Sequence, residues 1–131
     1  MTDYDLEIMA KTIFGEARGE GEEGQIAVAC CIINRHKAKK WFSGRTIAET
    51  CLRPWQFSCW NKNDPNAQKL ASLTYPTYSK YFPVIEKAKK KDITNGATHY
   101  FNPFVCQEPA WAKGKTPCAR IGHHLFFKGI D

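Results

Sequence analysis

The sequence predicts an α+β fold that is mainly helical and ends in a small β-sheet. Three observations lead to this prediction. Apolar residues recur at helical spacing through the first two long segments, and shorter segments with helix-capping signals follow them. Stretches with strand character stand in the last third of the chain. A length of 131 residues suits one domain, which we expect to span residues 1–131.

Two long helices are predicted in the first third of the chain. The first covers Asp3–Ala17, where apolar residues recur every three or four positions and Asp3 is placed to cap the start. The second covers Gln25–Ala38 and carries an apolar stripe. Glu22 and Glu23 precede it, where negative charges suit the positive end of the helix dipole. This second helix is expected to be the central one.

The middle of the chain predicts a short helix and then an irregular segment. Thr46 followed by Glu49 is a capping-box pattern, and the helix that it opens is expected to end before Pro54. The stretch Trp55–Pro65 is aromatic and polar and has no period. It is therefore interpreted as a loop with a function.

The last half predicts two more helices and two short strands. The helices are expected over Asn66–Leu73 and Thr77–Lys91, with a kink at Pro83 in the second. The strands are expected over Thr98–Phe101 and Leu125–Phe127. The two strands are expected to form the small sheet of the predicted fold.

The charge and the N-terminus restrict partners and location. A net charge of +6 attracts polyanions such as nucleic acid, anionic lipid or cell-wall polymers. No apolar run approaches the roughly 20 residues that span a bilayer, so no stable membrane insertion is expected. Residues 1–7 are acidic where a secretory signal would be basic and then apolar. We expect synthesis in the cytoplasm without a signal peptide.

Six cysteines leave two redox states open. None forms a CxxC pair and no histidine has zinc-finger spacing from them, so we expect no metal site. Cys30 and Cys31 lie in an apolar helical pattern and are expected to be small buried residues. One or two disulfides could form after release into an oxidising space, among the cysteines of the later segments, namely Cys51, Cys59, Cys106 and Cys118.

The segment Ile13–Glu20 contains the strongest candidate for catalysis. It places the carboxylate of Glu16 at the end of an apolar helix and beside glycines. Phe14 and aromatic residues from later loops can partly desolvate this carboxylate, as a general acid requires, and the glycines allow a bulky substrate to approach. From the residues alone, Glu16 could equally be a solvated charge paired with Arg18 or Lys11.

Several motifs resemble one family in the same order along the chain. The stretch Ile13–Arg35, IFGEARGEGEEGQIAVACCIINR, resembles the opening motif of cell-wall hydrolases of the SleB/CwlJ type. The later motifs are QFSCW at 56–60, TNGATHYFNP at 94–103, PAWA at 109–112 and IGHHLFF at 121–127. The resemblance therefore covers nearly the whole chain.

This resemblance implies a lysozyme-like domain that cuts peptidoglycan glycan strands between N-acetylmuramic acid and N-acetylglucosamine. It places the catalytic glutamate at Glu16 and implies no cofactor. The implied substrate-binding residues are Gln56, Phe57, Ser58, Tyr100 and Asn102. Phe57 and Tyr100 could instead be core aromatic residues. Trp111 is expected to cover the small sheet, and the enzyme is expected to act as a monomer.

The mechanism depends on whether a second carboxylate exists. Hydrolytic glycosidases normally need two, and the candidates in the sequence are Glu20, Glu22, Glu23 and Asp64. Resemblance to the family supplies a mechanism with one glutamate, lytic transglycosylation, in which the muramyl 6-hydroxyl attacks its own anomeric carbon and leaves a 1,6-anhydro end. We prefer this mechanism. A lysozyme-type muramidase that uses Glu16 and a second acid is the alternative.

Other classes of function fit less well. A basic nucleic-acid-binding module should interleave lysines with aromatic residues, yet the densest lysine run, 87–91, contains none. A peptidoglycan amidase or peptidase would need a zinc site or an activated cysteine, and no HExxH motif is present. A bare basic catalytic domain favours a phage endolysin released through a membrane lesion over a bacterial enzyme exported by an assembly.

Overall fold

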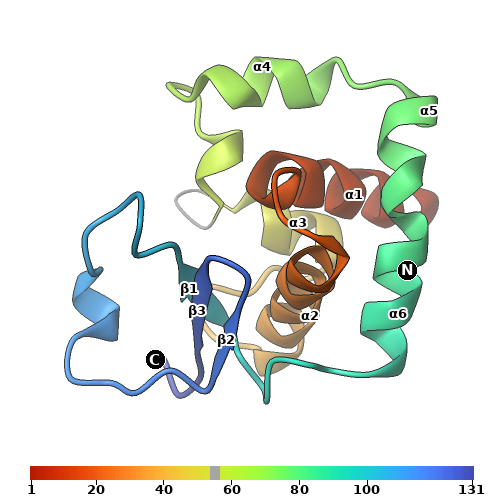
Figure 1. Cartoon of the computed structure of the whole chain (residues 1–131). Helices are drawn as coiled ribbons and strands as arrows, with labels where there is room; N and C mark the ends of the chain where they lie inside the picture. The colour runs from red at the N-terminus through yellow and green to blue at the C-terminus, as the bar shows by residue number, and fades with distance from the viewer. Residues whose placement is uncertain (54–56) are drawn as a thin grey trace.

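A computed structural model describes residues 1–53 and 57–131 of the chain. Helices α1 (Asp3–Ala17) and α2 (Glu22–Ala38) form its centre. Figure 1 shows α2 between the small sheet on one side and helix α6 (Phe82–Lys90) on the other. The predicted α+β class, mainly helical with a C-terminal sheet, is confirmed.

Helix α1 has the predicted bounds but a different cap. Thr2, not Asp3, is the N-cap residue, and it forms a capping box with Asp5. The Asp5 backbone N–H donates to the Thr2 hydroxyl over 3.1 Å, and the Thr2 N–H donates to the Asp5 carboxylate over 3.0 Å. The other Asp5 oxygen accepts from the Ala48 N–H over 2.9 Å. The capping box therefore also ties α1 to the next short helix.

The start of α2 and helix α3 (Ile47–Leu52) follow from local capping. Helix α2 begins three residues before the predicted start, because Gly21 serves as its N-cap and Glu22 and Glu23 fall inside its first turn. Helix α3 is capped as predicted, since the Thr46 side chain accepts from the Glu49 N–H over 3.0 Å.

The described part of the predicted loop Trp55–Pro65 contains a short 3-10 helix, η1 (Ser58–Trp60). Its last residues open helix α4 (Pro65–Ala71), because the Asp64 side chain accepts from the Asn66 N–H over 2.8 Å. The described residues of this segment thus contain more helical structure than their lack of periodicity indicated.

The prediction of a single helix over Thr77–Lys91 is wrong. The chain instead forms α5 (Tyr75–Tyr78), the 3-10 helix η2 (Ser79–Tyr81) and α6. Pro83 lies in the first turn of α6, where the missing N–H of proline breaks no helical bond. Proline here starts a helix and does not kink one.

The sheet has three antiparallel strands in the order β1-β3-β2. Strands β1 (His99–Phe101) and β3 (His124–Phe127) match the predicted strands to within one residue at their starts. Strand β2 (Ala119–Ile121) was not predicted, because three residues are too few to show an alternating pattern. A two-residue turn at Gly122, where φ is +58°, joins it to β3.

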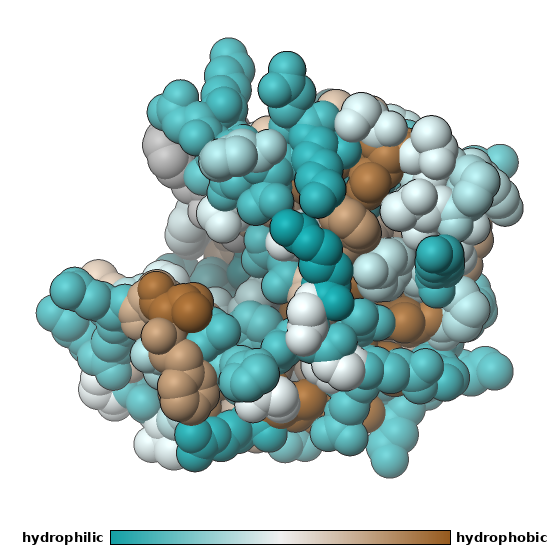
Figure 2. Space-filling view, turned by 45° about the horizontal axis from the view of Figure 1, so that its top comes forward, coloured by the Kyte–Doolittle hydropathy of each residue, from teal (hydrophilic) through white to brown (hydrophobic). Residues whose placement is uncertain are grey.

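Helix α2 carries apolar residues on both sides. One apolar cluster joins it to α1, α3, α4 and α6, and a second packs Ala27 and Cys31 against Ile121 and Phe126 beside the sheet. Figure 2 shows mainly hydrophilic residues on one face of the molecule, with hydrophobic residues in smaller patches. None of the helices in residues 1–53 and 57–131 has the length and apolar character needed to span a bilayer.

All six cysteines lie within the described ranges and each is a free thiol, so the structure does not contain the bridges that the sequence left open. Cys30 and Cys31 are buried, as predicted. Burial raises the pKa of Cys30 to about 11 and the pKa of Cys31 to about 12. These thiols therefore stay protonated and unreactive at neutral pH.

We expect a thiol reagent at pH 8 to modify the exposed Cys106 quickly in the native protein. The four buried cysteines, namely Cys30, Cys31, Cys51 and Cys59, should react only after unfolding. The absorbance of the thiolate that the reagent releases measures both the reaction of the native protein and the reaction after unfolding. Unfolding without a reductant should reveal all six thiols, and a smaller number would restore the disulfide hypothesis.

Candidate active site

Glu16 lies in the last turn of α1 and faces strand β1. Its side chain is half-buried, and one carboxylate oxygen accepts a hydrogen bond from the Tyr100 hydroxyl. These two residues are 84 positions apart in sequence. The predicted catalytic residue and one predicted substrate-binding residue are therefore brought together at the junction between the helices and the sheet.

A second side chain approaches Glu16 from η1. The Cys59 side chain is buried and lies close enough to the Glu16 carboxylate for the two groups to interact electrostatically. Gly15 makes this approach possible, because a Cβ at that position would lie 2.8 Å from Cys59 Cβ and 3.0 Å from Leu70 Cδ1. The glycine beside Glu16 thus lets η1 and α4 close against the end of α1.

Tyr100 and Cys59 both keep their protons at neutral pH. Burial, with the neighbouring Glu16 carboxylate adding to it, raises the pKa of Tyr100 well above its usual value. The same two causes, in the same order, raise the pKa of the Cys59 thiol. A neutral O–H can donate to a carboxyl oxygen, so the Tyr100 hydroxyl orients the Glu16 side chain.

Phe57 is a buried residue that packs beside Tyr100 and Arg35. It is only 2% exposed and lies under the Arg35 guanidinium, whose carbon is 4.4 Å from the ring centroid. The Tyr100 ring is 6.5 Å from it. The core interpretation that the sequence left open is therefore the one that fits Phe57, and direct contact with substrate does not follow from its position.

Arg35 lies in the last turn of α2 and was not among the predicted site residues. In the structure it is buried, and its Nε donates to the Thr98 carbonyl over 2.8 Å. It thereby ties α2 to the segment that leads into β1. The signal in the sequence was its place three residues after Ile32, on the apolar stripe of α2.

The remaining predicted binding residues have different settings. Ser58 is exposed at the start of η1. Asn102 follows β1 and shapes the next turn, because its side-chain oxygen accepts from the Phe104 N–H over 2.9 Å. Gln56 lies outside the described residues.

The tryptophans and histidines of the motifs are largely structural. Trp60 donates from Nε1 to the Thr12 hydroxyl over 2.8 Å. Trp111 packs against Phe127 with ring centroids 5.3 Å apart, so it covers the small sheet as predicted. His123 is exposed and His124 is buried, in line with the expectation that at least one of them points to solvent.

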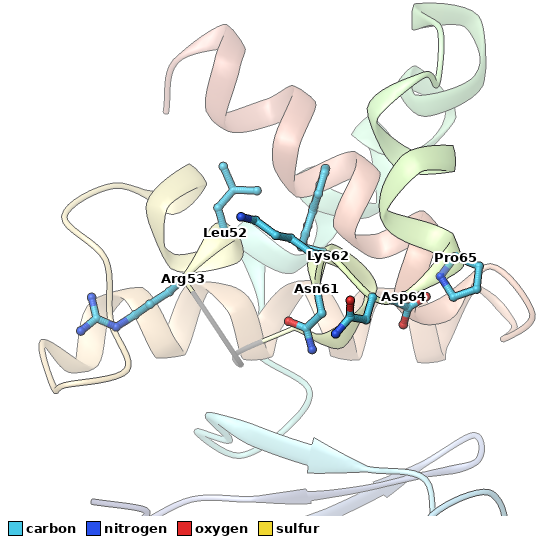
Figure 3. A pocket seen from close by; sticks show the side chains of 8 residues that line it. Leu52, Arg53, Asn61, Lys62, Asp64 and Pro65 are labelled. Atoms are coloured by element: carbon cyan, nitrogen blue, oxygen red, sulfur yellow. The ribbon is translucent and has the colours of Figure 1, made fainter.

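A cleft of about 730 Å³ opens beside η1. Figure 3 shows Asn61, Lys62 and Asp64 on one side of it, with Leu52 and Arg53 on the other. The lining combines amides and cations with the apolar surface of Trp60 and Leu52. Because η1 also carries Cys59, this cleft adjoins the element that touches Glu16.

The carboxylates that could serve as a second catalytic acid have other partners or lie elsewhere. Glu22 bonds Lys87 over 2.6 Å, and Asp64 caps α4. Glu20 bonds the turn between β2 and β3. Glu23 is exposed in the first turn of α2.

A protein-family model described as cell wall hydrolase matches residues 19–127. The spore cortex-lytic enzymes of Bacillus subtilis (strain 168) and Halalkalibacterium halodurans are each 30% identical to the chain over 125 residues. The alignments cover 95% of this chain, but only 38% and 35% of those proteins. The chain thus spans less than two fifths of the length of these relatives.

Two solved structures share the fold over nearly their whole length. The catalytic domain of the germination-specific lytic transglycosylase SleB from Bacillus anthracis has a TM-score of 0.77 and 29% identity, and the match covers 98% of this chain and 97% of that one. The catalytic domain of the Bacillus cereus SleB protein has a TM-score of 0.76 and the same identity, with 97% and 91% covered.

Proposed function

Because the chain belongs to the cell wall hydrolase family, we propose that it cleaves peptidoglycan glycan strands with Glu16 as the catalytic acid and base. The bond cut is the one between N-acetylmuramic acid and N-acetylglucosamine. The observation that supports this role is the half-buried Glu16 carboxylate, held by the Tyr100 hydroxyl where the helices meet the sheet. A glycan strand that follows this junction would pass Ser58, Tyr100 and Asn102, with Gln56 a further predicted contact.

The proposed reaction is lytic transglycosylation in two proton transfers. The protonated Glu16 gives its proton to the glycosidic oxygen as the bond from that oxygen to the muramyl anomeric carbon breaks. The carboxylate then accepts the proton of the muramyl 6-hydroxyl as that oxygen bonds to the anomeric carbon. A 1,6-anhydro ring closes, Glu16 is protonated again, and no water is consumed.

The partners of the other carboxylates support a mechanism with one glutamate. A hydrolytic glycosidase needs a second carboxylate facing the same bond, to activate water or to attack the sugar. Glu22 and Asp64 are engaged by Lys87 and by the first turn of α4, and Glu20 by the turn before β3. The names of the relatives agree, since one structural neighbour is described as a lytic transglycosylase.

The setting of this activity is the cell wall, which the enzyme is proposed to reach after release or export and to attack as a monomer. The cleft beside η1 offers Arg53 and Lys62 to the carboxylates of wall material. The net charge of +6 adds a general attraction toward an anionic polymer. Phage-type lysis remains our proposed context.

Mass spectrometry of digested peptidoglycan tests the mechanism. We expect muropeptides that end in 1,6-anhydro rings, each lighter than its hydrolysed counterpart by one water. Borohydride should leave these ends unchanged, because it reduces only the free anomeric ends that hydrolysis produces. A digest dominated by reducible ends would instead establish the muramidase alternative, and new amino groups would indicate an amidase.

A further inference from the structure

Glu20 lies in the connection between α1 and α2, and most of its side chain is shielded from solvent. Its side chain is 9% exposed and contacts the turn between β2 and β3. The backbone N–H of His123 donates to one oxygen over 2.9 Å, and His123 Nδ1 lies 2.7 Å from the other. His124 Nδ1 lies 3.4 Å from the first oxygen.

The surroundings of Glu20 are built to its shape. A Cβ on Gly122 would lie 2.5 Å from the Oε1 of Glu20, and a Cβ on Gly24 would lie 2.9 Å from the Cβ of Glu20. The backbone is held as well, because Gln25 Nε2 donates to the Glu20 carbonyl over 3.2 Å. Two residues without side chains thus leave room for one carboxylate between a helix start and a hairpin.

The charge of Glu20 suits an anchor and not a proton donor. Burial alone would raise the pKa of Glu20, but the hydrogen bonds from the His123 backbone and side chain, with the nearby imidazoles adding to them, outweigh it. The pKa lies below its usual value, so the side chain is an anion at neutral pH. An anion accepts the His123 bonds fully and has no proton to give to a leaving oxygen.

Contacts lead from this anchor to the catalytic residue. The ring of His124, which is buried, meets the Tyr100 ring edge to face with centroids 5.0 Å apart. Tyr100 in turn donates its hydroxyl hydrogen bond to Glu16. Glu16 and Glu20 therefore stand at the two ends of one line of contacts that passes through β1 and β3.

We propose that Glu20 is a positioning residue, which sets His124 against the Tyr100 ring by fixing the turn before β3 and so directs the Tyr100 hydroxyl at Glu16. This inference rests on the proposed role of Glu16. It gives Glu20 a part in the reaction that needs no contact with the substrate.

A double-mutant cycle tests this role. The cycle compares the wild type, Glu20→Gln, Tyr100→Phe and the combined variant in kcat and KM on soluble glycan strands. We expect Glu20→Gln to lower kcat about 10- to 100-fold with little change in KM, because small displacements of a catalytic group have costs of that size. In the Tyr100→Phe background, which lacks the hydroxyl, the same change should lower kcat far less.

Glu23→Gln is the matched control. It makes the same change of charge three residues away, on an exposed side chain of α2, and should leave kcat as in the wild type. A purely structural role of Glu20 would reduce the amount of folded enzyme. The fold-changes in kcat of the two single variants would then multiply in the combined variant, which means that their free-energy changes add. Such an additive cycle would overturn the proposal, and so would wild-type kcat in Glu20→Gln.

If Glu20→Gln does not fold, His123→Ala replaces it in the cycle. This change removes the exposed ring from the Glu20 carboxylate and keeps the backbone hydrogen bond, so we expect a smaller fall in kcat that again shrinks in the Tyr100→Phe background. Unchanged kcat in His123→Ala would overturn the proposal. Products with 1,6-anhydro ends in any active variant uphold the proposed function separately, whatever the cycle shows.

Discussion

Glu16→Gln should lower the rate of glycan cleavage by about 10²- to 10⁴-fold, the usual contribution of a general acid and base. Glutamine keeps the size of the side chain and still accepts the hydrogen bond of the Tyr100 hydroxyl. It has no proton to give to the glycosidic oxygen and cannot take one from the muramyl 6-hydroxyl. Loss of turbidity of purified walls and the yield of anhydro products measure the rate.

Folding and wall binding should survive this change. Circular dichroism, thermal unfolding and sedimentation with walls should match the wild type, and Glu23→Gln serves as the control for the loss of one negative charge. A correctly folded Glu16→Gln protein that lyses walls at the normal rate would show that Glu16 is not the catalytic acid and base.

Phe57→Ala should destabilise the protein by about 3 to 5 kcal/mol, as large-to-small changes of buried aromatic residues do. The ring is buried and lies against the Arg35 guanidinium, so its removal leaves a cavity beside a buried charge. For a domain of this length we expect the melting temperature to fall by roughly 10 to 20 °C. Thermal unfolding followed by circular dichroism measures the change.

Phe104→Ala is the comparison for this change, because the Phe104 side chain is 70% exposed. Its loss should alter the free energy of unfolding by no more than about 0.5 kcal/mol. If Phe57→Ala instead kept the melting temperature of the wild type and lost only affinity for walls, Phe57 would be a surface contact of the glycan and the core interpretation would be wrong.

The helices that the sequence predicted well are those whose signals are local. Helix α1 has the predicted bounds because its apolar residues recur over four turns, and Thr46 caps α3 as predicted. The break between α5 and α6 was missed because Pro83 was taken as a kink and not as a helix start, whereas the short strand β2 depends on tertiary contacts. Three residues of β2 carry too little pattern to separate a strand from a turn, and only their pairing with β3 defines them.

The candidate site divides in the same way. Resemblance to the family located Glu16 and Tyr100, which meet in the structure, but their roles in catalysis stay predictions. Cys59 was read as a possible disulfide partner and Glu20 as a possible second acid. Cys59 meets Glu16 from 43 positions away, and Glu20 bonds His123 from 103 positions away. The pattern of a single sequence does not indicate such distant pairs.

The strand order β1-β3-β2 also determines when the proposed active site can be complete during synthesis. Tyr100 lies on β1, and the backbone of β1 pairs only with β3 among the described strands, so the hydroxyl that orients Glu16 has no fixed position until residues 124–127 have left the ribosome. All the helices precede that point. A nascent chain can therefore form its helical core first, and the proposed catalytic site is complete only once β3 has paired with β1.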